Sequence, residues 1–201
     1  MFDSRLRPFI DPPLNRVASA VLRAGMTAEA VTWGGLALGL AAALAIAMGA
    51  PLIGLALFAC NRLADGLDGA VARNTQLTDR GGFLDIVCDF LIYAAIPLAF
   101  AIADPVHNAL PAAALLASFI ASGVTFLAFA TIAAKRGLET SAQGEKSIYY
   151  LAGLAEGAET IAVLCAMCLW PQWFPVLAIG FACVCTISAA ARIVAAMRAL
   201  R

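Results

Sequence analysis

Six long hydrophobic stretches, separated by short polar or proline-containing breaks, fill the chain between residues 28 and 197. A helix needs about 20 mostly apolar residues to cross a bilayer, and each stretch reaches that length. The pattern predicts an all-α integral membrane protein whose residues 1–201 form a single domain. The six transmembrane helices are expected at residues 28–49, 52–73, 82–103, 110–134, 148–170 and 173–197.

Residues 1–26 follow a different pattern. Three prolines interrupt their start, and no apolar run reaches the length of a signal peptide. From Asn15 onward, apolar side chains recur at helical spacing opposite Arg16 and Arg23. This spacing predicts an N-terminal amphipathic interfacial helix, with a solvated arm as the alternative.

Composition agrees with a membrane protein and argues against a nucleic-acid partner. Hydrophobic residues make up 63% of the chain and charged residues 13%, whereas soluble domains average about 45–50% apolar residues. The formal net charge is zero, so no electrostatic attraction to nucleic acid is expected.

Lysines and arginines of the predicted loops all fall on one side of the membrane. They precede the first stretch, lie between the second and third, lie between the fourth and fifth, or follow the sixth. The positive-inside rule therefore places both termini in the cytoplasm.

Four aspartates inside the second and third stretches are the strongest functional signal. Asp65 and Asp68 share one helix face, as do Asp85 and Asp89, because their spacings are three and four residues. Asp65 and Asp89 each lie about 12 Å from the cytoplasmic end of their helix, at about 1.5 Å per residue. A short connection makes the two helices antiparallel, so the four carboxylates are expected to converge.

Four converging carboxylates need neutralising cations in a low-dielectric setting. Two divalent ions would supply the charge, and oxygen ligands favour Mg²⁺ or Mn²⁺. Such a pair can clamp the attacking and leaving oxygens of a phosphoryl transfer. Small residues around the aspartates serve either close helix packing or a nucleotide site, and Arg73 beside them suits a phosphate.

The aspartates belong to a longer pattern that resembles the signature of the CDP-alcohol phosphatidyltransferase family, D-x2-D-G-x2-A-R, a spacer, then G-x3-D-x3-D. The spacer here is one residue shorter than usual, which moves no predicted ligand. The fixed positions of the signature fall on Asp65, Asp68, Gly69, Ala72, Arg73, Gly81, Asp85 and Asp89. Residues 27–32 also resemble the T-P-[ND]-x-V-T entry of the family, although Ala28 and Glu29 depart from it, which leaves open whether Glu29 or Thr32 contacts the nucleotide.

The resemblance implies an enzyme that transfers the phosphatidyl group from CDP-diacylglycerol to a small alcohol in the bilayer, releasing CMP. It implies that Asp65, Asp68, Asp85 and Asp89 bind two divalent cations, Mg²⁺ or Mn²⁺, and that Asp89 is also the general base. Gly69, Ala72, Arg73 and Thr78 would bind the CDP moiety. An inner-membrane homodimer with a cytoplasmic active site is expected.

The acceptor alcohol stays open between glycerol phosphate, inositol phosphate and an amino alcohol. Basic residues are absent from the fourth stretch at residues 125–134, which weakens a phosphorylated acceptor without excluding it. Candidate acceptor residues are Lys135, Lys146, Glu156, Glu159 and Arg192. Two other classes of protein compete with an enzyme: a cation transporter or channel that uses the intramembrane aspartates, and a structural membrane subunit with buried neutral acids.

Overall fold

A computed structural model of the chain describes residues 14–136 and 157–200, and within these residues it is helical without strands. A helical segment at residues 14–23 comes first. It is followed by α2 (Ala28–Ala47), α3 (Pro51–Asn74), α4 (Asp79–Ala103), α5 (Pro105–Lys135), α6 (Gly157–Leu169), the 3-10 turn η2 (Pro171–Trp173) and α7 (Phe174–Ala199).

Local signals explain where the helices start. Thr27 caps α2 by accepting from the Ala30 amide at 3.2 Å, and Thr78 caps α4 by accepting from the Gly81 amide at 3.0 Å. Asp104 ends α4 and caps α5 through the His107 amide at 3.3 Å, and its side-chain hydrogen bond with His107 lowers the pKa of the Asp104 carboxyl. Because Asp104 caps so tightly, α5 begins at Pro105 and not at residue 110 as the pattern predicted.

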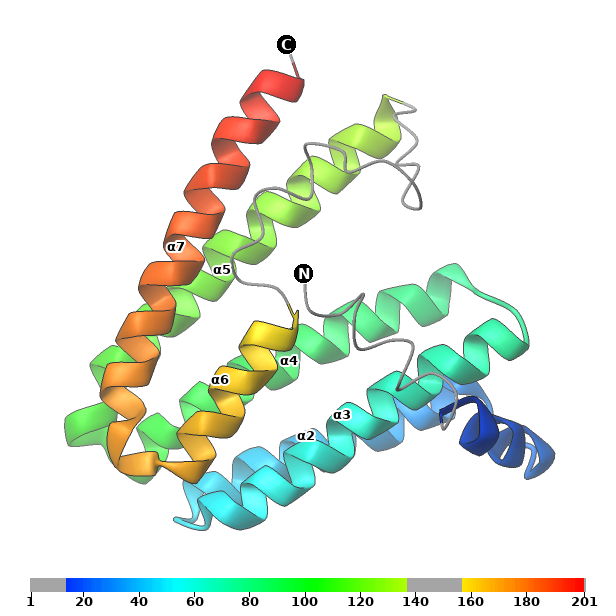
Figure 1. Cartoon of the computed structure of the whole chain (residues 1–201), viewed down its shortest axis with the longest axis horizontal. Coiled ribbons are helices and arrows are strands. Elements are labelled where there is room, and N and C mark those ends of the chain that lie inside the picture. Colours follow the sequence, from blue (N-terminus) through cyan, green and yellow to red (C-terminus); the bar gives the residue numbers. More distant parts are fainter. Residues whose placement is uncertain (1–13, 137–156, 201) are drawn as a thin grey trace.

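The helices form two groups that diverge, as Figure 1 shows: α2, α3 and α4 make up the first, and α5 and α7 make up the second. α2 packs closely against α3, α5 packs closely against α7, and α4 contacts both α2 and α5. α6 lies between α3 and α7. The groups meet near the start of α7 and separate toward the ends of α3, α5 and α7.

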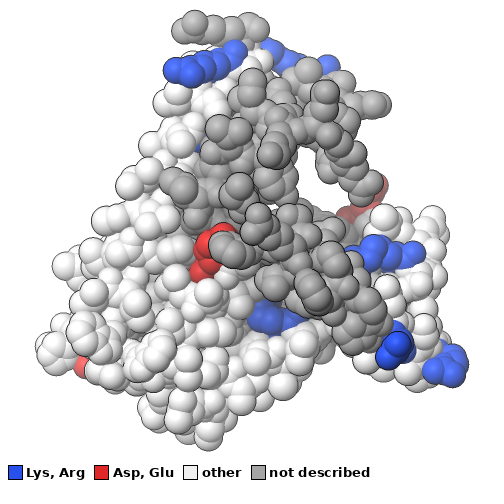
Figure 2. Space-filling model, in the orientation of Figure 1, with Lys and Arg blue, Asp and Glu red and all other residues white. Residues whose placement is uncertain are grey.

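Among the described residues, four helical segments are long and apolar enough to cross a membrane: α2, α4, α5 and residues 171–199. α3 has the length but also carries charged side chains, and the described part of α6 has 13 residues. Residues 148–156, the first part of the predicted stretch 148–170, lie outside the described residues. Figure 2 shows most of the blue Lys and Arg side chains near the separated helix ends, whereas the lower left of the molecule is largely uncharged.

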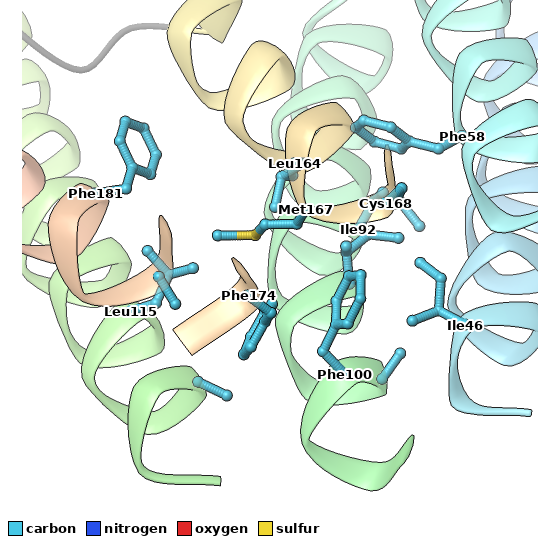
Figure 3. Close-up of a cluster of buried hydrophobic side chains, with 14 of the residues drawn as sticks. Ile46, Phe58, Ile92, Phe100, Leu115, Leu164, Met167, Cys168, Phe174 and Phe181 are labelled. Atoms are coloured by element: carbon cyan, nitrogen blue, oxygen red, sulfur yellow. The ribbon is translucent and has the colours of Figure 1, made fainter. Parts of the chain in front are cut away.

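The main hydrophobic core lies where the two groups meet (Figure 3). Phe100 of α4 stacks on Phe174 of α7 with ring centroids 4.6 Å apart. Every helix from α2 to α7 contributes fully buried side chains, among them Ile46, Phe58, Ile92, Leu115, Leu164, Met167 and Phe174. The core thus holds the helices together at one end, and the charged side chains lie toward the other end, where the helices separate.

A smaller cluster attaches the first helical segment to α3. Ala18 is fully buried against Ala70 and Val71, with Leu14 packed beside them. A Cβ at Gly66 would lie 3.1 Å from the Leu14 Cδ1 atom, so glycine permits this contact. The segment therefore packs on the face of α3 next to the residues of the signature, and its placement at a membrane surface stays a prediction.

Candidate active site

The four aspartates of the signature lie on α3 and α4 near the separated ends of these helices. The guanidinium of Arg62 on α3 faces two of them, because its Nη1 atom lies 3.7 Å from Asp65 Oδ2 and 2.8 Å from Asp89 Oδ1. α2 packs closely against both α3 and α4. These contacts bring Asp65 and Asp89 to one side chain, and the convergence of all four carboxylates stays a prediction.

Asp68 is held by α2. Its carboxylate is buried, and the Thr32 hydroxyl donates to its Oδ2 atom at 2.6 Å. The same hydroxyl lies 3.1 Å from the Ala28 carbonyl oxygen, which can share its single proton. Thr32, left open above as a nucleotide contact, therefore bonds to an aspartate of the signature.

Asp89 is held by Arg62, a residue that the sequence analysis did not single out. The Arg62 Nη1 atom lies 2.8 Å from Asp89 Oδ1, 3.0 Å from the Tyr93 hydroxyl and 3.7 Å from Asp65 Oδ2. Its side chain is only 11% exposed. An arginine three residues before Asp65 shares a helix face with it, and this spacing is the signal that could have identified Arg62.

The donor set suits a hard divalent cation, because all four side chains offer carboxylate oxygens. Within the part of the chain that is described, however, no three Asp, Glu, His or Cys side chains are grouped tightly enough to hold a metal ion. Two of the carboxylates have protein donors, Thr32 for Asp68 and Arg62 for Asp89. Asp65 lies 3.7 Å from the same guanidinium, and Asp85 is exposed.

The predicted CDP-binding residues follow the aspartates along α3 and into α4. Arg73 is exposed in the last turn of α3. A Cβ at Gly69 would lie 3.3 Å from the Arg73 Nη1 atom, so the guanidinium lies close to the glycine. Ala72 is half-buried one position earlier, and the Thr78 hydroxyl oxygen caps α4.

The described residues of the predicted acceptor site lie on α5, α6 and α7. Lys135 is exposed at the end of α5, and Glu159 is half-buried in the first turn of α6. Arg192 of α7 donates to the carbonyl oxygen of Ser122 at 3.1 Å and to its hydroxyl at 3.0 Å. Lys146 and Glu156 lie outside the described residues.

An ion pair joins the beginnings of α2 and α4. Arg80 Nη2 lies 3.2 Å from Glu29 Oε2, and the Arg80 side chain is largely exposed. Glu29 occupies the position where the family entry carries Asn or Asp. In this structure the carboxylate of Glu29 therefore has a basic partner on α4.

Sequence relatives point to membrane enzymes. The chain is 43% identical over 193 residues to the inner membrane protein YnjF of Escherichia coli, covering 96% of this chain and 94% of that protein. It is 32% identical over 166 residues to an archaetidylinositol phosphate synthase of Methanothermobacter thermautotrophicus, covering 80% of this chain and 72% of the synthase.

Solved structures share the fold. The phosphatidylinositol phosphate synthase of Mycobacterium tuberculosis with bound CDP-DAG matches with a TM-score of 0.68 at 23% identity, over 91% of this chain and 92% of that chain. Its complex with manganese and citrate matches with a TM-score of 0.68 at 26% identity, over 92% and 88%. The family model for CDP-alcohol phosphatidyltransferases matches residues 25–197. The chain is therefore an enzyme of the CDP-alcohol phosphatidyltransferase family.

Proposed function

We propose that this enzyme transfers the phosphatidyl group of CDP-diacylglycerol to the hydroxyl of a small polar alcohol and releases CMP. The observation that carries the proposal is the set of four aspartates on α3 and α4 with Arg73 at the end of α3. The bound CDP-DAG and manganese of the two related structures support this choice of donor and metal.

Each residue has a role in the proposed mechanism. Asp89 accepts the proton of the acceptor hydroxyl, whose oxygen then forms a bond to the phosphatidyl phosphorus. The bond from that phosphorus to the CMP oxygen breaks, and CMP leaves. Arg73 binds the diphosphate with its forked guanidinium, while Gly69, Ala72 and Thr78 line the cytidine nucleotide. Two divalent cations, Mg²⁺ or Mn²⁺, held by Asp65, Asp68, Asp85 and Asp89 would neutralise the diphosphate and stabilise the leaving group.

The acceptor is one of three candidates: glycerol phosphate, inositol phosphate or an amino alcohol. The names of the archaeal synthase and the mycobacterial synthase both contain inositol phosphate, which supports a phosphorylated polyol. Lys135, Lys146 and Arg192 are the proposed partners of an acceptor phosphate. For an amino alcohol, Glu156 and Glu159 would supply the opposite charge.

We propose a single domain of six transmembrane helices, with α3 and the α6 region as the two spans beyond the four apolar ones. The first helical segment would lie at the cytoplasmic surface of the inner membrane, and the protein would be a homodimer. Orientation is tested with cysteines introduced into a cysteine-free background. Asn74→Cys should be protected from an impermeant thiol reagent in intact cells, and His107→Cys should react; the reverse pattern would contradict the orientation.

The proposed reaction is tested with purified protein in proteoliposomes that contain CDP-diacylglycerol and Mn²⁺. Each acceptor should be tried in turn with labelled CDP-diacylglycerol, with the released CMP measured and the lipid products separated by chromatography. Only one acceptor is expected to give CMP and a new lipid at a high rate. Metal-driven cation flux without CMP release from any acceptor reaction would instead support the transporter hypothesis.

A further inference from the structure

Arg62 is placed differently from an arginine that only extends to a membrane surface. It lies three residues before Asp65 on α3, and its side chain is 11% exposed. One guanidinium nitrogen, Nη1, bonds to both Asp89 at 2.8 Å and the Tyr93 hydroxyl at 3.0 Å. A charge inside a membrane protein is costly unless it is paired, so these bonds are needed for Arg62 to stay where it is.

The guanidinium is also fixed from its other side. Its Nε atom donates to Asn61 Oδ1 at 2.8 Å, and the buried Asn61 amide donates to the Gly35 carbonyl oxygen of α2 at 2.8 Å. The rings of Phe58 and Tyr93 lie 5.5 and 5.2 Å from the Arg62 Cζ atom. Arg62 is therefore oriented by α2, α3 and α4 together, and it fixes the position of Asp89 in turn.

The same contact limits how a metal ion can use Asp89. A divalent cation bound by Asp89 would compete with the guanidinium for carboxylate oxygens, and it would lie within a few ångströms of a positive charge. The other aspartate with a protein donor, Asp68, is bonded to the neutral Thr32 hydroxyl. Asp89 thus differs from Asp68 in the charge of its partner.

We propose that Arg62 is a positioning residue of the active site that holds Asp89 in place and competes with the second divalent cation for its carboxylate. The inference rests on the proposed function, in which Asp89 is both the base and a metal ligand. Arg62 lies nearer to Asp89 Oδ1, at 2.8 Å, than to Asp65 Oδ2, at 3.7 Å. A cation bound mainly through Asp68 and Asp85, with Asp65 beside them, would therefore be held more tightly. The second would bind only as Asp89 exchanges Arg62 for the metal.

The test measures Mn²⁺ binding to purified protein without substrate, by the paramagnetic resonance signal of free Mn²⁺. Arg62→Met removes the competing charge and should tighten the weaker Mn²⁺ site by about tenfold or more. Arg62→Lys keeps the charge but loses the fork that reaches Asp89 and Tyr93 together. We expect Arg62→Lys to bind Mn²⁺ like the wild type and to turn over more slowly at saturating Mn²⁺.

Arg198→Met, at the exposed end of α7, is the matched control and should change neither quantity. Thermal unfolding of each variant checks that it is folded. If Arg62→Met does not fold, Arg62→Gln keeps an amide donor for Asp89 without the charge and should show the same tightening. Unchanged or weaker Mn²⁺ binding in the folded uncharged variant would overturn the inference. A wild type that binds no Mn²⁺ and releases no CMP from CDP-diacylglycerol with any of the three acceptors would instead count against the proposed function.

Discussion

The α2–α4 group and the α5–α7 pair both contain long apolar helices, but they use polar side chains differently. In the first group, Thr32 bonds to Asp68, Asn61 bonds to Gly35 and Arg62 bonds to Asp89, and each bond joins two helices. Between α5 and α7, the described polar contacts run from Arg192 to Ser122 and from Arg136 to the Leu200 carbonyl.

The difference is in what the polar contacts orient. The bonds of the α2–α4 group set the directions of carboxylates, whereas the bonds between α5 and α7 set the distance between two helices. Apolar packing such as the edge-to-face contact of Phe119 with Phe181 supports the second pair. Substitutions in the α2–α4 group should therefore mainly change turnover. Substitutions in the α5–α7 pair should mainly change stability or acceptor binding.

The largest effect is expected at the aspartates. Asp89→Asn removes the proposed base and should lower turnover by about 10²–10⁴-fold at every metal concentration. Asp65→Asn and Asp68→Asn should weaken Mn²⁺ binding, so excess metal should recover part of their activity. Turnover of each variant across a Mn²⁺ titration is the measurement.

Asp104→Asn is the control for the aspartate series, because asparagine also caps a helix and Asp104 lies at the far end of α4. Its turnover should match the wild type. Full recovery of Asp89→Asn by metal alone would show that Asp89 is only a ligand and that another residue is the base.

A smaller effect is expected at Arg73, which lies in the same group but contacts the donor and not the reacting hydroxyl. Arg73→Lys keeps the charge and loses the bidentate geometry, so the KM for CDP-diacylglycerol should rise about tenfold. Arg198→Lys provides the comparison on α7. Donor affinity that is unchanged even in Arg73→Ala would remove Arg73 from the donor site.

Close packing inside the first group gives the third prediction. A Cβ at Gly39 would lie 2.4 Å from the Ile92 Cδ1 atom and 3.2 Å from the Asn61 amide, whereas a Cβ at Gly180 on α7 meets nothing within 4 Å. Gly39→Ala should lower the free energy of unfolding by about 1–3 kcal/mol. Gly180→Ala should leave it unchanged or raise it slightly. Thermal unfolding in detergent compares the two, and equal effects would contradict the described α2–α4 contact.

The smallest effect is expected between α5 and α7. Ser122→Ala removes one of the two acceptors of Arg192 and should destabilise the protein by about 0.5–1.5 kcal/mol. The KM for the acceptor should rise, whereas the KM for CDP-diacylglycerol should stay at the wild-type value. A parallel rise in the KM for CDP-diacylglycerol would show that the two groups do not act separately.

Sequence pattern predicted the all-helical fold and the family, and it places the aspartates in pairs on two helices, because both follow from simple periodicities. Hydrophobic length marks a spanning helix, and spacings of three and four residues place carboxylates on one face. The start of α5 was predicted five residues late, since hydropathy does not register a cap such as Asp104 followed by Pro105.

Arg62 was missed for a physical reason. The positive-inside rule uses loop cations, and Arg62 lies before the first fixed position of the signature, Asp65. Its role depends on Asp89 and Tyr93, which are 27 and 31 residues away in sequence. Likewise, the short connection between α3 and α4 suggested direct packing, but α2 with its small Gly35 and Gly39 is the helix that packs closely on both.

The junction at Asp104 means that a small rotation at the start of α5 becomes a large displacement at its other end. One residue ends α4 and begins α5, and α5 then continues for 31 residues, a length of about 46 Å. A rotation of about one degree at that junction would displace the Lys135 end by about 0.8 Å. Gly123 allows close contact with α4 part-way along α5, where a Cβ would lie 2.4 Å from the Phe90 ring. A bulkier side chain at Gly123 would thus change the angle between α4 and α5 and move the Lys135 end without touching any aspartate.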